Sequence, residues 1–115
     1  MDETQALDAL GALSQETRLR IVRLLVTAGP DGMAAGAIGE AMGATSSRLS
    51  FHLTHLEAAG LVQSRRNGRS IRYSAVYDAL SGLIAFLMRD CCQGHPDVCT
   101  PALSASACPP METAE

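Results

Sequence analysis

The stretch that decides the fold is residues 45–76, TSSRLSFHLTHLEAAGLVQSRRNGRSIRYSAV. Its first half carries leucines that cluster on one side of a helix. Its second half predicts two strands, 61–66 and 69–76, that flank Asn67-Gly68, the dipeptide that best suits a two-residue type I′ hairpin turn. A helix followed by a β-hairpin is therefore expected.

The residues before this helix predict a tight turn between two helices. Gly43 is well placed to end a short helix, at about 34–42, in a left-handed conformation. Thr45, Ser46 or Ser47 can then cap the next helix. Helix, short turn and helix make the outline of a helix-turn-helix, and the hairpin behind it has the place of a wing.

The amino-terminal quarter predicts two further helices, at about 3–12 and 15–27. Ser14 is the expected cap of the second helix, and Glu16 supplies an acid in its first turn. The first helix is predicted from apolar residues at helical spacing, which are Ala6, Leu7, Leu10 and Leu13.

The last predicted helix, residues 77–91, is apolar nearly all round, and so small a monomer cannot cover it. A symmetric dimer contact is expected there. The predicted fold class is mainly α with a β-hairpin: a homodimeric winged helix-turn-helix in the order α-α-α-α-β-β-α. Residues 1–92 are expected to form the DNA-binding and dimerisation domain, and residues 93–115 a binding loop and a flexible tail.

Composition favours one soluble domain in the cytoplasm, without a membrane partner. The chain has 115 residues, which allow one modest core. It begins with no secretory signal pattern, and its longest apolar run, residues 79–88, is far shorter than the roughly 20 residues of a membrane span.

Charge is distributed unevenly. The formal net charge is −3, yet residues 45–73 hold five arginines and one glutamate. The rest of the chain is acidic, so one basic region stands out on an acidic body. Double-stranded DNA is the expected partner of that region.

The helix within residues 45–76 has two unlike faces. Leu49, Leu53 and Leu56 are expected to hold it to the body, while hydroxyls and one arginine on the other face suit the major groove. Arginines around the hairpin are expected to reach phosphates or the minor groove. The predicted DNA contacts are Ser46, Ser47, Arg48, Ser50, Phe51, Thr54, His55, Arg65, Arg66, Arg69 and Arg72.

Plainer interpretations stand beside these. The arginines could belong to a solvated hairpin, and the serines could serve only as caps. His52 borders the apolar side and is expected to be a packing histidine rather than a base reader.

Three stretches together resemble the ArsR/SmtB family of metal-sensing repressors: LSQETRLRIVRLL at 13–25, SSRLSFHLTHLEAAGLV at 46–62 and RRNGRSIRY at 65–73. The resemblance implies a winged-helix dimer built on the first and last helices. It also implies binding to an imperfect palindrome in an operator, often with repression of the regulator's own transcript.

All four cysteines lie in the last quarter of the chain, which favours ligand or redox thiols over a disulfide framework. The family's arsenic site at the start of the recognition helix is absent, because no cysteine precedes Cys91. The run DCCQGHPDVC at 90–99 instead resembles a carboxy-terminal variant of arsenic-responsive ArsR proteins. This resemblance implies that Cys91, Cys92 and Cys99 bind As(III) or Sb(III) as the inducer.

The spacing of these cysteines is physically reasonable. Neighbours on a helix point about 100° apart, so Cys91 and Cys92 can meet on one ion only where the helix ends, and Gly94 and Pro96 provide that end. Three thiolates suit a soft pyramidal ion. Cys108, in the tail, is expected to be dispensable.

Two alternatives to a metalloid site remain open. His95 could complete a Cys₃His set for Zn(II) or Cd(II), and the thiols could form a redox sensor on the same scaffold. Catalysis is not expected, because the chain has no paired carboxylates, glycine-rich phosphate loop or nucleophile–base pair. The predicted function is transcriptional repression, relieved when the inducer is bound.

Overall fold

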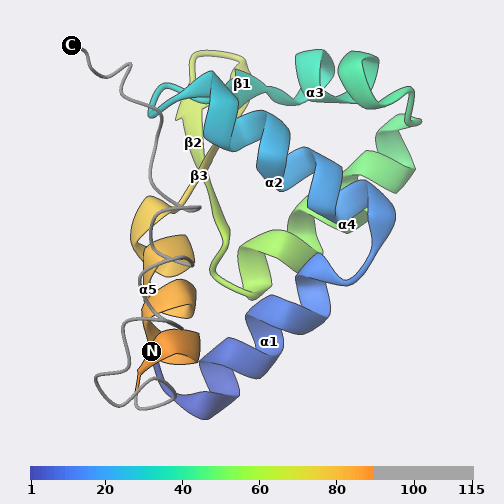
Figure 1. The fold of residues 1–115 in the computed structure, drawn as a ribbon. Coiled ribbons are helices and arrows are strands. Elements are labelled where there is room, and N and C mark those ends of the chain that lie inside the picture. Colours follow the sequence, from blue (N-terminus) through green and yellow to red (C-terminus); the bar gives the residue numbers. More distant parts are fainter. Residues whose placement is uncertain (90–115) are drawn as a thin grey trace, which may run out of the picture. The chain divides into compact units, whose positions relative to one another are not determined.

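The computed structural model describes residues 1–89. These form five helices and three strands (Figure 1), one strand more than predicted. The first compact unit is residues 1–83, and the boundary to a second unit falls within the last helix. The elements are α1 (Glu3–Leu13), α2 (Glu16–Ala28), β1 (Met33–Ala34), α3 (Ala35–Met42), α4 (Ser46–Ala58), β2 (Val62–Asn67), β3 (Ser70–Ala75) and α5 (Tyr77–Met88).

The turn between α3 and α4 forms as predicted. Gly43 ends α3 in the left-handed conformation, with φ 65° and ψ 31°, which a glycine adopts without strain. Thr45 is the N-cap of α4, and its hydroxyl accepts a hydrogen bond from the Arg48 backbone N–H at 3.3 Å. The helix-turn-helix therefore consists of α3, this turn and α4.

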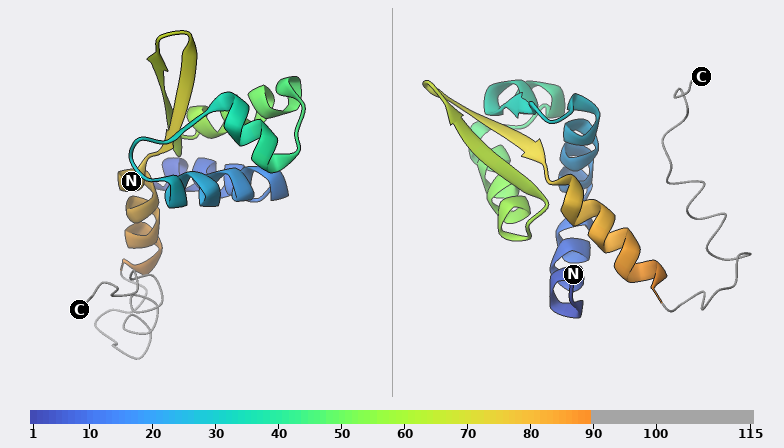
Figure 2. Two further views of the ribbon diagram at one scale, coloured as in Figure 1. Left: turned by 90° about the horizontal axis from the view of Figure 1, so that it is seen from above. Right: turned by 90° about the vertical axis from the view of Figure 1, so that its left-hand side faces the viewer.

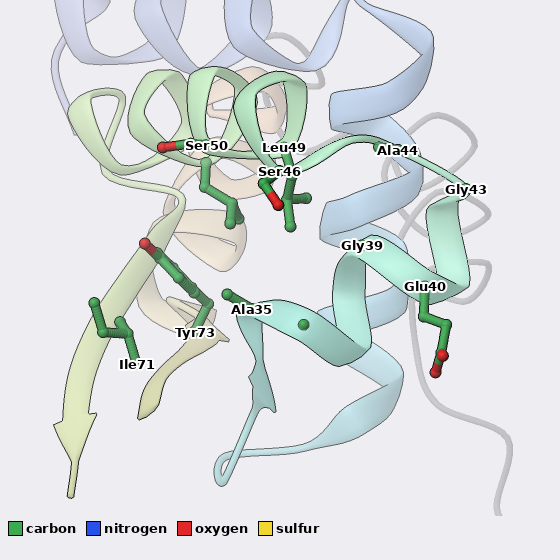
Figure 3. Close-up of a pocket in the computed structure, with 12 residues that line it drawn as sticks. Ala35, Gly39, Glu40, Gly43, Ala44, Ser46, Leu49, Ser50, Ile71 and Tyr73 are labelled. Atoms are coloured by element: carbon green, nitrogen blue, oxygen red, sulfur yellow. The ribbon is translucent and has the colours of Figure 1, made fainter. Parts of the chain in front are cut away.

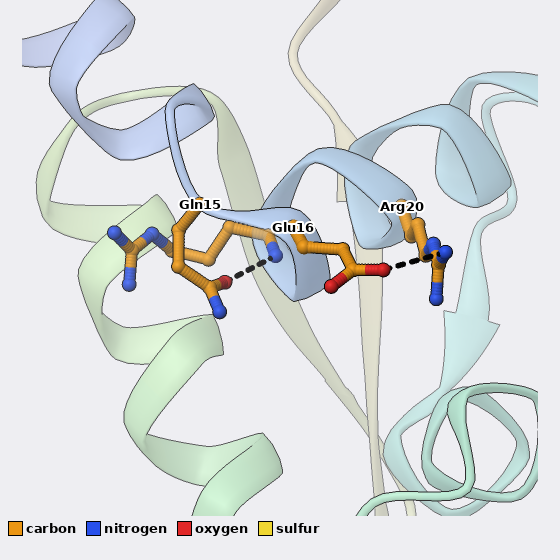
Figure 4. A network of polar contacts seen from close by, with 4 residues as sticks. Gln15, Glu16 and Arg20 are labelled. Atoms are coloured by element: carbon orange, nitrogen blue, oxygen red, sulfur yellow. Dashed lines mark hydrogen bonds and ion pairs between the residues drawn. The ribbon is translucent and has the colours of Figure 1, made fainter.

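The junction between α1 and α2 differs from the prediction by one residue. The N-cap of α2 is Gln15, whose side-chain oxygen accepts from the Arg18 backbone N–H at 2.9 Å (Figure 4). Ser14 instead ends α1, with its hydroxyl donating to the Gly11 carbonyl. Glu16 lies in the first turn of α2 as expected and pairs with Arg20 at 2.6 Å, an exposed ion pair of the kind that adds little stability.

The predicted hairpin is confirmed, but its turn is shifted along the chain by one residue. Asn67 pairs with Ser70, so Gly68 is the first of the two central residues rather than the second. Gly68 has φ 66°, as primed hairpin turns require at that first central position. Figure 2 shows the hairpin tip projecting beyond α3 and α4.

The strand β1 extends the hairpin to a three-stranded antiparallel sheet in the order β1-β3-β2. Met33 pairs with Tyr73, and Ala34 pairs with Arg72. A strand of two residues has no periodicity that the sequence could display, because its only support is a pairing partner far along the chain.

The core is built around α4, which packs against α1, α2, α3 and β2. Its inner face is the predicted leucine set, all buried: Leu49, Leu53 and Leu56. In α1 the buried face is made of alanines rather than leucines, while Leu7 and Leu10 remain 61% and 40% exposed. The small alanine side chains allow α1 to pack closely against α2 and α4, and Leu7 and Leu10 lie on the outside of the monomer. The buried alanines are Ala6, Ala9 and Ala12.

No helix within residues 1–89 is long and apolar enough to cross a membrane.

Candidate nucleic-acid interface

The outer face of α4 carries every predicted DNA contact of that helix, and each is exposed. The arrangement follows from the helix itself, since the inner face is occupied by the buried leucines. The exposed residues on the outer face of α4 are Ser46, Ser47, Arg48, Ser50, Phe51, Thr54 and His55. Hydroxyls, a guanidinium and an imidazole on one helical face are the groups that read base edges in a major groove.

Phe51 is the large apolar group at the middle of this face. Its side chain is 65% exposed, and its ring meets the rings of His52 and His55 edge to face, with centroids 5.4 Å and 6.4 Å away. An exposed aromatic ring on a reading helix gains free energy when it covers an apolar group such as a thymine methyl. Phe51 is therefore the apolar contact of the candidate interface.

The amino terminus of α4 adds a positive end. The first N–H groups of a helix carry partial positive charge and favour phosphate oxygens. Arg48 lies in this first turn and is exposed, so its guanidinium reinforces that charge. The start of α4 is thus suited to the DNA backbone, while its middle is suited to the bases.

The wing arginines surround the hairpin turn. Arg65 and Arg66 lie on β2 and Arg69 lies in the turn, all exposed. Within residues 1–89 the one ion pair is that between Glu16 and Arg20, so no carboxylate neutralises these three cations there. Cations held apart from acids are the groups that neutralise DNA phosphates.

Arg72 has a different environment from the other wing arginines. It is half-buried, and its guanidinium donates to the backbone carbonyls of Asp31 at 3.1 Å and Gly32 at 2.9 Å. A Cβ on Gly32 would lie 2.1 Å from the Tyr73 carbonyl oxygen, which shows how closely this loop lies on β3. Arg72 thus fastens the loop before β1 to the wing, and its predicted DNA contact stays a prediction.

A hollow of about 430 Å³ lies between α3, α4 and β3 (Figure 3). Ser46 and Ser50 of α4 line one wall, and Ile71 and Tyr73 of β3 line the other. Burial and then the Glu57 carboxylate raise the pKa of Tyr73, so its hydroxyl stays protonated. Two of the predicted DNA contacts, Ser46 and Ser50, therefore border this hollow.

His52 was expected to be a packing histidine, and it is half-buried beside the core. Its Nδ1 lies 3.3 Å from an Arg18 guanidinium nitrogen. Burial, then the charges of Arg18, Arg48 and His55, lower the pKa of His52. Sequence reasoning missed Arg18, although its spacing from Ile21 on α2 places it on the buried side of that helix.

The predicted ligand residues lie outside the described part of the chain. These are Cys91, Cys92, Cys99 and His95, and Cys108 lies outside it as well. Within residues 1–89, no three His, Cys, Asp or Glu side chains come together in a way that could hold a metal ion.

Comparison with known proteins agrees with this geometry. Residues 13–65 match the family model of a helix-turn-helix domain. The HTH-type transcriptional regulator YgaV of Escherichia coli is 34% identical over 88 residues, which cover 76% of this chain and 87% of YgaV. The structure of an ArsR-like transcriptional regulator from Rhodococcus sp. RHA1 aligns with a TM-score of 0.68 and 29% identity, covering 90% of this chain and 93% of that one. The chain belongs to the ArsR-like family of winged helix-turn-helix transcriptional regulators.

Two further relatives of this ArsR-like regulator are informative. Nodulation protein NolR of Rhizobium meliloti is 37% identical over 78 residues, and this alignment spans 68% of the present chain but only 62% of NolR. The homodimeric winged helix-turn-helix DNA-binding domain of Mb0332 from Mycobacterium bovis has a TM-score of 0.62 and 30% identity, with 73% of this chain and 75% of that one covered. The Mycobacterium bovis protein is described as a possible ArsR-family transcriptional regulator, and YgaV as an HTH-type transcriptional regulator.

Proposed function

We propose that this regulator is a homodimeric repressor that holds operator DNA and releases it when As(III) or Sb(III) binds the thiolates of Cys91, Cys92 and Cys99. The proposed DNA binding is supported by the exposed outer face of α4, with its hydroxyls, Arg48 and Phe51, and by the unpaired arginines of the wing.

Two copies are needed to give this interface useful specificity. One α4 spans only a few base pairs, whereas a symmetric dimer presents two reading helices about 34 Å apart to two half-sites of a palindrome. The exposed Leu7 and Leu10 of α1 are apolar groups that a dimer contact would cover. Dimerisation therefore supplies both specificity and burial.

The proposed response to As(III) or Sb(III) rests on the pattern of cysteines. Three cysteines fall within nine residues, and soft thiolates prefer soft ions such as As(III) and Sb(III) over Mg²⁺ or Ca²⁺. These three ligands suffice for a pyramidal metalloid. His95 would be needed only for a tetrahedral Zn(II) or Cd(II) site.

The required coupling is modest. Each 1.4 kcal/mol of differential binding changes operator affinity about tenfold. A hundredfold release therefore needs about 3 kcal/mol between the inducer-loaded and inducer-free dimers, which lies at the upper end of ordinary allosteric couplings.

The test is a titration with arsenite. Arsenite is added to the reduced dimer while the dimer is bound to a duplex selected from a random pool. The wild-type protein is expected to release the duplex. Cys91→Ser, Cys92→Ser and Cys99→Ser are expected to bind it equally well and to remain bound, while Cys108→Ser, the matched control, responds like the wild type.

Other outcomes reject parts of the proposal. Release by Zn(II) or Cd(II), lost in His95→Ala, would favour the Cys₃His site over the metalloid site. Release by oxidant without any ion, reversed by a thiol reductant, would favour a redox sensor. Full arsenite response in all three cysteine variants would reject the ligand set.

A further inference from the structure

Arg18 is the only charged side chain that is buried within residues 1–89, with 8% of its surface exposed. The one ion pair of that part of the chain does not include it. A buried guanidinium is costly unless its N–H groups find acceptors. Arg18 meets this need with two unusual partners, one on α1 and the other on α4.

The first partner is the end of α1. The Arg18 Nε–H donates to the Ala12 carbonyl oxygen at 2.7 Å, in the last turn of that helix. The last carbonyls of a helix lack partners within the helix and carry partial negative charge. The carboxyl end of α1 thus takes the place of a carboxylate as the counter-charge of Arg18.

The second partner is the ring of His52, on α4. An Arg18 NH1 group lies 3.3 Å from His52 Nδ1. Because a guanidinium can only donate, Nδ1 must accept, and the ring proton must be on Nε2. A protonated ring would point an N–H group at a cation, so this contact exists only while His52 is neutral.

The surroundings of His52 favour that neutral form. The charged or titratable groups that act on it are Arg18 from α2 and Arg48 and His55 from its own helix, all basic. Burial acts in the same direction and, with these groups, lowers the pKa of His52. The acceptor is therefore present at neutral pH.

His52 is also adjacent to the reading face. Its ring contacts the ring of Phe51, and Arg48 lies one helical turn earlier. We infer that Arg18 and His52 are positioning residues for DNA recognition: the guanidinium ties α4 to the end of α1 and thereby fixes the direction in which the reading face points. This inference rests on the DNA binding proposed above.

The test compares two substitutions of His52. Asparagine places an oxygen close to the position of Nδ1 and keeps the acceptor, whereas leucine removes it. Against a duplex selected from a random pool, His52→Leu is expected to lose about tenfold in affinity, and His52→Asn to stay within about twofold of the wild type. Affinities are measured by fluorescence anisotropy, below the melting temperature of each variant, so that lost stability does not count as lost recognition.

Arg18→Met is expected to weaken binding like His52→Leu. Arg20→Met is the matched control, because it removes one exposed arginine from the same helix without touching His52, and it should bind as the wild type does. If Arg18→Met does not fold, the two His52 variants and the acid profile carry the test alone.

The acid profile separates positioning from a merely structural role. Between about pH 7 and about pH 5, the wild-type protein is expected to lose affinity relative to His52→Asn, because the protonated ring repels Arg18. Superimposable profiles, or His52→Leu binding as tightly as the wild type, would overturn the inference alone. Failure of the wild type to select any duplex would overturn the proposed DNA binding and this inference with it.

Discussion

At the scale of single residues, two arginines hold parts of the fold together. Arg18 donates to the Ala12 carbonyl, and Arg72 donates to the carbonyls of Asp31 and Gly32. Main-chain carbonyls are good acceptors for a guanidinium, whose several N–H groups can join segments that are far apart in sequence.

The neutral state of His52 makes stability depend on pH. Its pKa is lowered in the folded chain, so the unfolded chain, with an ordinary histidine value of 6.5, binds the proton more readily. The free energy of unfolding is therefore expected to fall as pH decreases below about 6.5 and to level off once the folded form is protonated too. Urea unfolding at a series of pH values measures this. His52→Asn should lack that part of the slope, and an equal slope in both proteins would contradict the assignment.

Gly32 occupies a position where the backbone conformation and the neighbouring strand leave no room for a side chain. It has φ 69°, and a Cβ would lie 2.1 Å from the Tyr73 carbonyl oxygen. Gly32→Ala is expected to lower the free energy of unfolding by about 2 kcal/mol or more, from backbone strain and the clash together. Gly36→Ala is the control, because a Cβ there meets nothing within 4 Å and alanine favours the helix. Thermal melts that rank the two variants in the opposite order would contradict this account.

At the scale of elements, local signals predicted the helix-turn-helix and the hairpin well. Gly43 and Thr45 act within their own turns, so residue type was enough to locate the end of α3 and the start of α4. What was missed depends on partners distant in sequence. The strand β1 exists through its pairing with β3, and the buried alanine face of α1 depends on how closely α1 packs. Neither leaves a periodic pattern in the sequence.

The wing gives the prediction that belongs to this scale. Arg66→Ala or Arg69→Ala is expected to weaken DNA binding and to reduce the slope of log affinity against log salt by about two, because each removes one phosphate contact from each protomer of the dimer. Arg23→Ala, on α2, is the control and should leave the slope unchanged. Titrations at several salt concentrations measure the effect. A slope unaltered by the loss of either wing arginine would mean that the hairpin does not touch the DNA backbone.

At the scale of the whole molecule, the exposed leucines of α1 bear on assembly. Leu10→Glu is expected to convert the dimer to a monomer, since it places a charge where an apolar contact is proposed, and each buried leucine contributes about 1.5–3 kcal/mol. Leu19→Glu, on α2 and 44% exposed against 40% for Leu10, is the matched control and should remain dimeric. Sedimentation equilibrium distinguishes the two. A Leu10→Glu protein that sediments as a dimer would remove α1 from the contact.

If a dimer reads duplex DNA through α4 and the wing, selection from a pool of random duplexes will reveal its sequence preference. We expect enrichment of an imperfect palindrome whose half-sites lie about ten base pairs apart and which is bound at least about a thousandfold more tightly than unselected duplex. A pool that shows no enriched sequence after repeated rounds, or an enriched sequence that the Phe51→Ala protein binds as tightly as the wild type, would contradict it.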